Sequence, residues 1–154
     1  MSNTPEKLPG SPGCVICDNN HSNPRSLGLQ LFWNTDNKTV NIPCLPDETW
    51  CGYSGIVHGG LVASVLDEAM AWVVKQTTGD WAFTADCHIR FKAALVPNKR
   101  YTATASVREA SSRKITANAT FTDAKGTVVA QADAIFIPAK GRARPFAGGS
   151  AKTD

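Results

Sequence analysis

The fold of this chain is decided by residues 55–74, Gly-Ile-Val-His-Gly-Gly followed by the run LVASVLDEAMAWVV. Apolar side chains recur in the run at spacings of three and four residues, the period of a helix with one broad apolar face. They are Leu61, Val62, Val65, Leu66, Ala69, Met70 and Val73. Most of the remaining surface is apolar too, through Ala63, Ala71, Trp72 and Val74. We therefore predict a helix from Leu61 to Val74 that lies inside the protein.

Two carboxylates interrupt the apolar surface near its middle. Burying the charge of Asp67 or Glu68 is costly unless the charge is paired or used. One interpretation places both on a solvent-facing stripe marked by Glu68, Ala71 and Lys75. The other gives Asp67 a chemical role. Asp67 lies eight residues after Gly59, which is roughly 12 Å along the helix axis, about the length of a small acyl group.

The start of the predicted helix favours the second interpretation. Gly59 and Gly60 are poor helix formers, but they leave the first backbone N–H groups uncovered by side chains. Such an end carries unpaired donors and the positive pole of the helix dipole. It can therefore hold an anion or an oxyanion that develops during a reaction.

The residues from Gly55 to Ala69 resemble the hotdog-fold thioesterases, and more narrowly the branch that includes the phenylacetyl-CoA thioesterases. His-Gly-Gly followed at the right distance by Asp67 is the specific part of the resemblance. A weaker likeness extends from Cys14 to about Pro138. The resemblance implies a hotdog fold, in which an antiparallel sheet of about six strands wraps around one long central helix. It also implies a homodimer with active sites at the interface, or a homotetramer made of two dimers.

The pattern of the other segments independently predicts an α+β protein. A hairpin precedes the helix and an antiparallel meander follows it, so a sheet that curls around the helix would bury its apolar surface. The predicted strands are Leu27–Trp33, Thr39–Cys44, Ala82–Phe91, and segments that begin at Tyr101, Ile115 and Thr127.

The strand after the helix alternates, which predicts one buried face and one exposed face. The buried face would hold Phe83, Ala85, Cys87, Ile89 and Phe91, and the other would hold Thr84, Asp86, His88 and Arg90.

Length and composition indicate one domain, because 154 residues with 42% hydrophobic content can bury a sizeable core. We expect a lead-in over residues 1–26, a hotdog domain over 27–138 and a flexible tail over 139–154. A net charge of +3 does not suggest a nucleic-acid partner. No signal peptide or membrane span is evident, so we expect a cytoplasmic protein with no membrane partner.

The lead-in contains a Cys-x-x-Cys motif, Cys14-Val-Ile-Cys17, with His21 close behind. Two thiolates and an imidazole could provide three of the four ligands of a zinc ion, but the sequence offers no evident fourth ligand. We therefore expect no metal site and a lead-in that packs on the domain or lies at its surface. Thioredoxin-like redox chemistry is less favoured still. Five cysteines, an odd number, fit reduced thiols better than a disulfide framework.

The resemblance implies acyl-CoA hydrolysis, with no cofactor apart from the CoA moiety of the substrate. Asp67 would act as a general base on water or attack the thioester carbon itself. The N–H of Gly59, beside Gly60, would polarise the thioester oxygen. We expect His58 to shape the loop or bind the acyl end rather than act as the base. Glu68, about 100° away round the helix, is expected to be structural.

One departure from the family pattern weakens this expectation. Related thioesterases often carry Asn or Gln fifteen residues before the acid, where this chain has Gly52. Ser54 or Thr84 could supply the missing polar group. The alternative function is a non-catalytic module that binds acyl-CoA or an aromatic ligand. A hydratase is disfavoured, because that pattern needs a histidine shortly after Asp67.

Substrate contacts are the least defined part of the sequence. Basic residues are needed for the CoA phosphates, and Arg113 and Lys114 are favoured over Arg90 and Lys92 because backbone N–H groups could be free at their turn. An aromatic pocket would favour aryl or medium-chain thioesters. The aromatic candidates are Trp50, Tyr53, Trp72, Trp81 and Phe83.

Overall fold

Helix α1 (Gly59–Thr78) forms the centre of the computed structural model, which describes residues 3–140. The predicted helix is confirmed and extends further at both ends. It ends at Gly79, whose φ of 82° is the left-handed conformation that favours glycine, and the Gly79 N–H donates to the Lys75 carbonyl. Its buried residues are Val62, Val65, Leu66, Ala69, Met70, Trp72, Val73 and Val74. The central helix is thus a core element.

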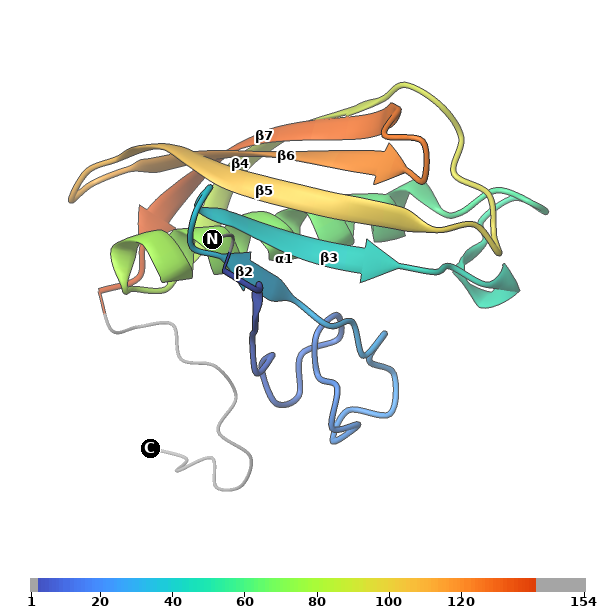
Figure 1. Ribbon diagram of the computed structural model, residues 1–154, viewed down its shortest axis with the longest axis horizontal. Helices are drawn as coiled ribbons and strands as arrows, with labels where there is room; N and C mark the ends of the chain where they lie inside the picture. Colours follow the sequence, from blue (N-terminus) through green and yellow to red (C-terminus); the bar gives the residue numbers. More distant parts are fainter. Residues whose placement is uncertain (1–2, 141–154) are drawn as a thin grey trace.

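One antiparallel sheet of seven strands, in the order β1-β2-β3-β5-β6-β7-β4, curls around this helix (Figure 1). About six strands were expected, and the seventh is the short β1 from the lead-in. The strands are β1 (Glu6–Lys7), β2 (Phe32–Asn34), β3 (Thr39–Cys44), β4 (Ala82–Phe91), β5 (Tyr101–Ala110), β6 (Ile115–Asp123) and β7 (Val128–Pro138). A short 3-10 helix, η1 (Glu48–Trp50), lies between β3 and α1.

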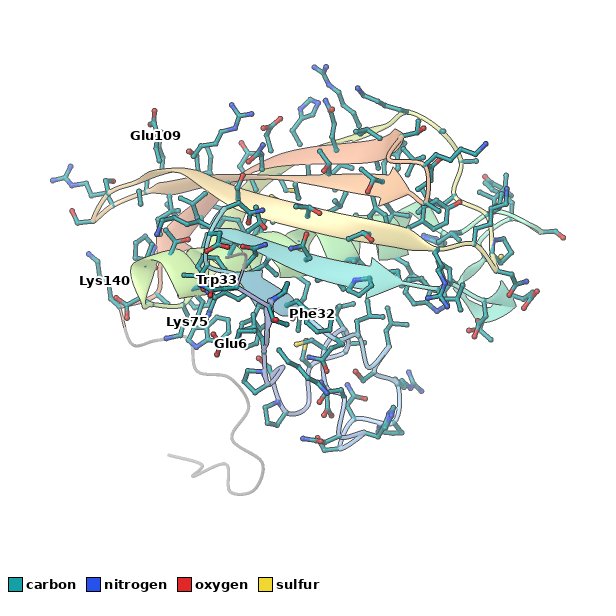
Figure 2. The ribbon with its side chains drawn as sticks, in the orientation of Figure 1. Glu6, Phe32, Trp33, Lys75, Glu109 and Lys140 are labelled. Carbon is teal, nitrogen blue, oxygen red and sulfur yellow. The ribbon has the colours of Figure 1, made fainter. Side chains whose placement is uncertain are left out.

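Small side chains let the sheet approach the helix closely. Alanines occupy buried positions on the inner faces of three neighbouring strands, while Phe121 and Phe136 fill the larger spaces between sheet and helix. On the outer side of the sheet, Glu109 of β5 points away from α1 (Figure 2). On the helix itself, Lys75 points away from the sheet. The buried alanines are Ala103, Ala105, Ala117, Ala119, Ala130, Ala132 and Ala134.

Strand β2 is much shorter than the predicted Leu27–Trp33. The N–H groups of Leu27 and Leu29 donate to the carbonyls of Val15 and Ile16, at 2.8 and 2.9 Å. These residues therefore pair with the lead-in instead of with β3.

The lead-in is packed against the sheet and the helix. Ile16 and Cys17 are buried, and so is Asp18 at 1% exposure. The carboxylate of Asp18 accepts the Ser22 hydroxyl at 2.6 Å and the Asn23 N–H at 2.7 Å. These hydrogen bonds lower the pKa of Asp18 to about 2. A buried, hydrogen-bonded carboxylate thus holds the loop that follows Cys17.

Two further expectations concern the C-terminal tail and membrane-spanning helices. The predicted flexible tail, residues 139–154, lies outside the described residues except for its first two. Within residues 3–140, neither α1 nor η1 combines the length and the hydropathy that crossing a bilayer requires.

Candidate active site

The first turn of α1 leaves one backbone donor free. His58 caps the helix: its Nδ1 accepts the Gly60 N–H at 2.8 Å, and its carbonyl accepts the N–H groups of Leu61 and Val62 at 3.0 and 3.2 Å. Within the described part of the chain, the Gly59 N–H has no hydrogen-bond acceptor. Of the three predicted catalytic residues at this end, Gly59 is therefore the available donor, while the Gly60 N–H donates to the His58 ring.

The imidazole of His58 also explains two glycines. A Cβ on Gly60 would lie 2.9 Å from Nδ1 of His58, and a Cβ on Gly52 would lie 2.9 Å from its Cδ2. A side chain at either position would displace the ring from the helix start. The His58 ring thus fills the space next to Gly52, the position where the resemblance leads one to expect an amide.

A groove of about 520 Å³ opens at this end of α1, and Gly59 is part of its wall. Of the aromatic candidates, only Tyr53 lines it; Trp50 and Trp72 are buried, and Trp81 packs edge-on against Trp72 with ring centroids 5.0 Å apart. Phe91, whose ring lies beside Gly59, was not among the predicted aromatic residues of the pocket. The lining residues are Gly52, Tyr53, Ile56, Val57, His58, Gly59, Gly60, Val62, Phe91, Lys92, Ala93, Ala94 and Leu95.

Asp67 lies further along the helix and is not part of this groove. Its carboxylate is half-buried, and its Oδ1 accepts the Thr84 hydroxyl at 2.7 Å. Thr84 comes from β4, the strand beside this part of the helix. The hydrogen bond fixes the orientation of the carboxylate. Thr84, one of the two residues predicted to replace the amide, thus contacts the predicted base.

A β-bulge in β4 brings Thr84 to the helix. The register with β7 shifts between Thr84 and Asp86, which leaves Ala85 as the extra residue. Thr84 is paired with buried Phe136, so its side chain shares the inner face. The predicted strict alternation is therefore wrong at this point, because Thr84 faces the helix. The face predicted to be buried is also only partly covered: Cys87 and Ile89 are half-buried, whereas Phe83, Ala85 and Phe91 are exposed.

Glu68 does not lie on a solvent-facing stripe. Its Oε1 accepts the Trp72 indole N–H at 3.2 Å and lies 3.4 Å from the Cys14 Sγ of the lead-in. Burial is the largest contribution that raises the pKa of Glu68 to about 7. The lead-in covers this side of α1, while Asp67 faces β4.

The predicted substrate-binding residues are dispersed. The N–H groups of Arg113 and Lys114 are not free, because they donate to the Ser111 hydroxyl oxygen at 3.3 and 3.1 Å. Their turn follows the ten residues of β5, so it lies roughly 30 Å from the end of the sheet that carries the groove. Arg90 and Ser54 are exposed outside the groove wall. Lys92 is the basic residue that lines it.

The model of the thioesterase superfamily matches residues 54–130, half of the chain, and thus both α1 and β4. The chain belongs to the thioesterase superfamily. Among curated proteins, the comparison gave no match.

Solved structures of thioesterase superfamily proteins show the same hotdog fold. One, described as a thioesterase superfamily protein, has a TM-score of 0.66 and 24% identity over 74% of this chain. This chain spans only 57% of that protein's length. A Streptococcus mutans protein bound to acetyl CoA has a TM-score of 0.62 and 18% identity, covering 66% of this chain and 81% of that one. The E. coli PaaI protein of the phenylacetic acid degradation operon has a TM-score of 0.61 and 20% identity, covering 64% and 75%. The predicted fold is confirmed.

Proposed function

We propose that this member of the thioesterase superfamily hydrolyses acyl-CoA thioesters to the free acid and CoA. The observation that carries the proposal is the free Gly59 N–H at the positive end of α1, on the wall of an apolar groove. A preorganised donor there would stabilise the negative charge that develops on the thioester oxygen. Binding of acetyl CoA by a structural neighbour supports a CoA ester as the ligand class.

Asp67 would supply the base. In this scheme its carboxylate takes a proton from water, the resulting hydroxide adds to the thioester carbon, and the carbon–sulfur bond then breaks to release the CoA thiolate, which is protonated. The hydrogen bond from Thr84 holds the carboxylate in one orientation for this step. Direct attack by Asp67 on the carbon, followed by hydrolysis of the anhydride, uses the same groups.

The spacing of these groups favours a site shared between two copies of the chain. Gly59 and Asp67 are eight residues apart on one helix, or roughly 12 Å. The Gly59 N–H must contact the thioester oxygen directly, and Asp67 must reach the same carbonyl group either directly or through one water molecule. Two copies related by a two-fold axis would place Gly59 of one opposite Asp67 of the other. The unpaired edge of β4, where Phe83 and Phe91 are exposed, offers a surface for such an association.

The groove favours a flat or apolar acyl group. Tyr53 and Phe91 present aromatic surface in it, and Ile56, Val62 and Leu95 add aliphatic surface. Lys92 lines the groove and would supply the positive charge for a phosphate of CoA. We therefore propose aryl or medium-chain acyl-CoA thioesters as the preferred class.

The direct test measures hydrolysis of a panel of aryl, short-chain and medium-chain acyl-CoA thioesters. The loss of the thioester absorbance reports the rate. We expect turnover by the native protein and a loss of about a hundredfold or more in Asp67→Asn, as for removal of a general base. If neither protein hydrolyses any thioester while both bind CoA esters equally well, a non-catalytic binding module replaces this proposal.

A mixing experiment tests the shared site. Asp67→Asn and Gly59→Pro are each expected to be inactive, but a mixed pair of subunits would contain one site with both native groups. Equal mixing with free exchange would then restore about a quarter of native activity. A site built within one chain would give no recovery.

A further inference from the structure

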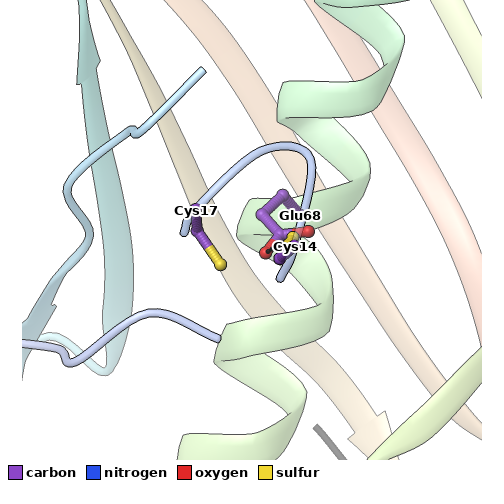
Figure 3. A group of neighbouring side chains, drawn as sticks. All are labelled: Cys14, Cys17 and Glu68. Carbon is purple, nitrogen blue, oxygen red and sulfur yellow. Dashed lines mark hydrogen bonds between the residues drawn. The ribbon is translucent and has the colours of Figure 1, made fainter. Parts of the chain in front are cut away.

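We infer that Cys14, Cys17 and Glu68 form a binding site for a zinc ion that joins the lead-in to the central helix. Their ligand atoms, two Sγ and one carboxylate oxygen, lie within 4.8 Å of one another. Figure 3 shows the two cysteines on the lead-in loop, facing Glu68 on α1. No local sequence motif contains this combination, because Glu68 lies more than fifty residues beyond Cys17.

The separations suit a tetrahedral ion. Zn–S bonds of about 2.3 Å and Zn–O bonds of about 2.0–2.2 Å place neighbouring ligand atoms roughly 3.5–3.8 Å apart. The Cys14 Sγ is already 3.4 Å from the Glu68 Oε1. A small inward movement of the Cys17 side chain would complete the set of three ligands. Because Cys14 is only half-buried, a water molecule can reach the ion as the fourth ligand.

The backbone around the two cysteines is arranged to support thiolates. The Ile16 N–H donates to the Cys14 Sγ at 3.4 Å, and the Ser11 N–H donates to the Cys17 Sγ at 3.2 Å. Donors directed at metal-bound sulfur atoms offset their negative charge and orient them. Each of the two sulfur atoms therefore has at least one backbone donor.

Glu68 is held in place as the third ligand. Its carboxylate accepts the Trp72 indole N–H at 3.2 Å, which fixes the side chain against the lead-in. No lysine or arginine among residues 3–140 forms an ion pair with it. A largely enclosed carboxylate without a cationic partner is costly, and a divalent ion would provide the missing positive charge.

The ligand chemistry selects the metal. Two thiolates are soft ligands, which favour zinc over magnesium or calcium. His21, the third ligand considered from the sequence, is exposed and lies outside this group. Glu68 takes its place.

The experiment titrates the full chain with Zn²⁺ after reduction and removal of metals with a chelator. A chromophoric zinc indicator gives affinity and stoichiometry, Co²⁺ absorbance reports thiolate ligation, and thermal unfolding with and without Zn²⁺ reports coupling to the fold. Cys17→Ser and Glu68→Gln each remove one ligand at nearly constant size. Cys87→Ser removes a half-buried thiol outside the group and is the matched control.

We expect one Zn²⁺ per chain for the native protein and Cys87→Ser, with a higher Tm when the ion is bound. Cys17→Ser and Glu68→Gln should lose about a hundredfold or more in affinity, since even outer-shell changes cost 10–100-fold. The inference is overturned if the reduced native protein binds no Zn²⁺. Equal affinity for Zn²⁺ in Cys17→Ser and in the native protein would also overturn the inference. It is likewise overturned if the two cysteines only form a Cys14–Cys17 disulfide and bind no Zn²⁺ when reduced. None of these readouts depends on thioester hydrolysis.

Discussion

Replacing Gly59 with proline would delete one donor of α1 and keep the helix start. Proline is favoured at the first helical position, because its fixed φ suits the helix and the N–H it lacks has no helical acceptor there. His58 has φ −60° and ψ 127°, the extended conformation that a residue before proline prefers. A Cβ at Gly59 would meet only the Phe91 ring, at 3.5 Å, an ordinary contact. The variant should therefore fold.

The size of the effect follows from the role of the N–H. Loss of one oxyanion donor lowers kcat by about 10²–10³, or about 2.7–4 kcal/mol. KM should change less, because the donor binds the developing oxyanion more strongly than the thioester carbonyl. The free energy of unfolding should stay within about 1 kcal/mol of native or rise, since proline restricts the unfolded chain.

Steady-state hydrolysis of the best thioester of the panel and urea unfolding measure the two effects. Gly59→Ala is the control, because alanine adds a Cβ but keeps the N–H. The reasoning is refuted if Gly59→Pro keeps kcat within about threefold of native, far from the loss expected for an oxyanion donor. It is also refuted if Gly59→Ala loses as much as Gly59→Pro, because the cause would then be lost space in the groove.

Two further substitutions and one labelling experiment test other parts of the structure. Thr84→Val removes the hydrogen bond to Asp67. Because Thr84 is exposed, we expect the activation free energy to rise by about 1 kcal/mol, which lowers kcat roughly fivefold. Thr84→Ser keeps the hydroxyl and should be near native in the same steady-state assay. Leu66→Ala, at a fully buried position of α1, should lower the free energy of unfolding by about 2–5 kcal/mol in urea titrations, and a loss below about 1 kcal/mol would contradict the packing. Burial raises the pKa of Cys44 to about 12, so mass spectrometry after iodoacetamide treatment in mildly alkaline buffer should find it labelled only in denaturant. Rapid labelling of the native protein would show that Cys44 is accessible.

The helix and most strands were predictable because their apolar residues follow the periods of regular structure. Strand β3 has the predicted bounds, and β4 does as well. The face of β4 was not predictable at Thr84, because one extra residue at Ala85 reverses the alternation without changing the composition of the strand. Sequence patterns report periods, whereas a bulge is set by pairing with another strand.

In the candidate site, too, some features were predictable from local sequence patterns and others were not. The donor at Gly59 follows from glycine chemistry at a helix start, and Asp67 is conspicuous as a charge on an apolar surface. Pairing of the Gly60 N–H with His58 depends on a ring orientation that no local pattern encodes. The contact between Cys14 and Glu68 depends on how the lead-in folds across α1, a long-range outcome.

The two edges of the sheet are unequal, and this limits how strands can be added to it. Strand β4 offers ten residues along its free edge, whereas β1 at the opposite edge has two, Glu6 and Lys7, both charged and exposed. Short, charged edges resist pairing with other chains. If two copies join through β4, the combined sheet ends in β1 on both sides and no third copy finds a matching edge. Such an association would consume the long edge of β4, the surface through which further strands could most readily be added.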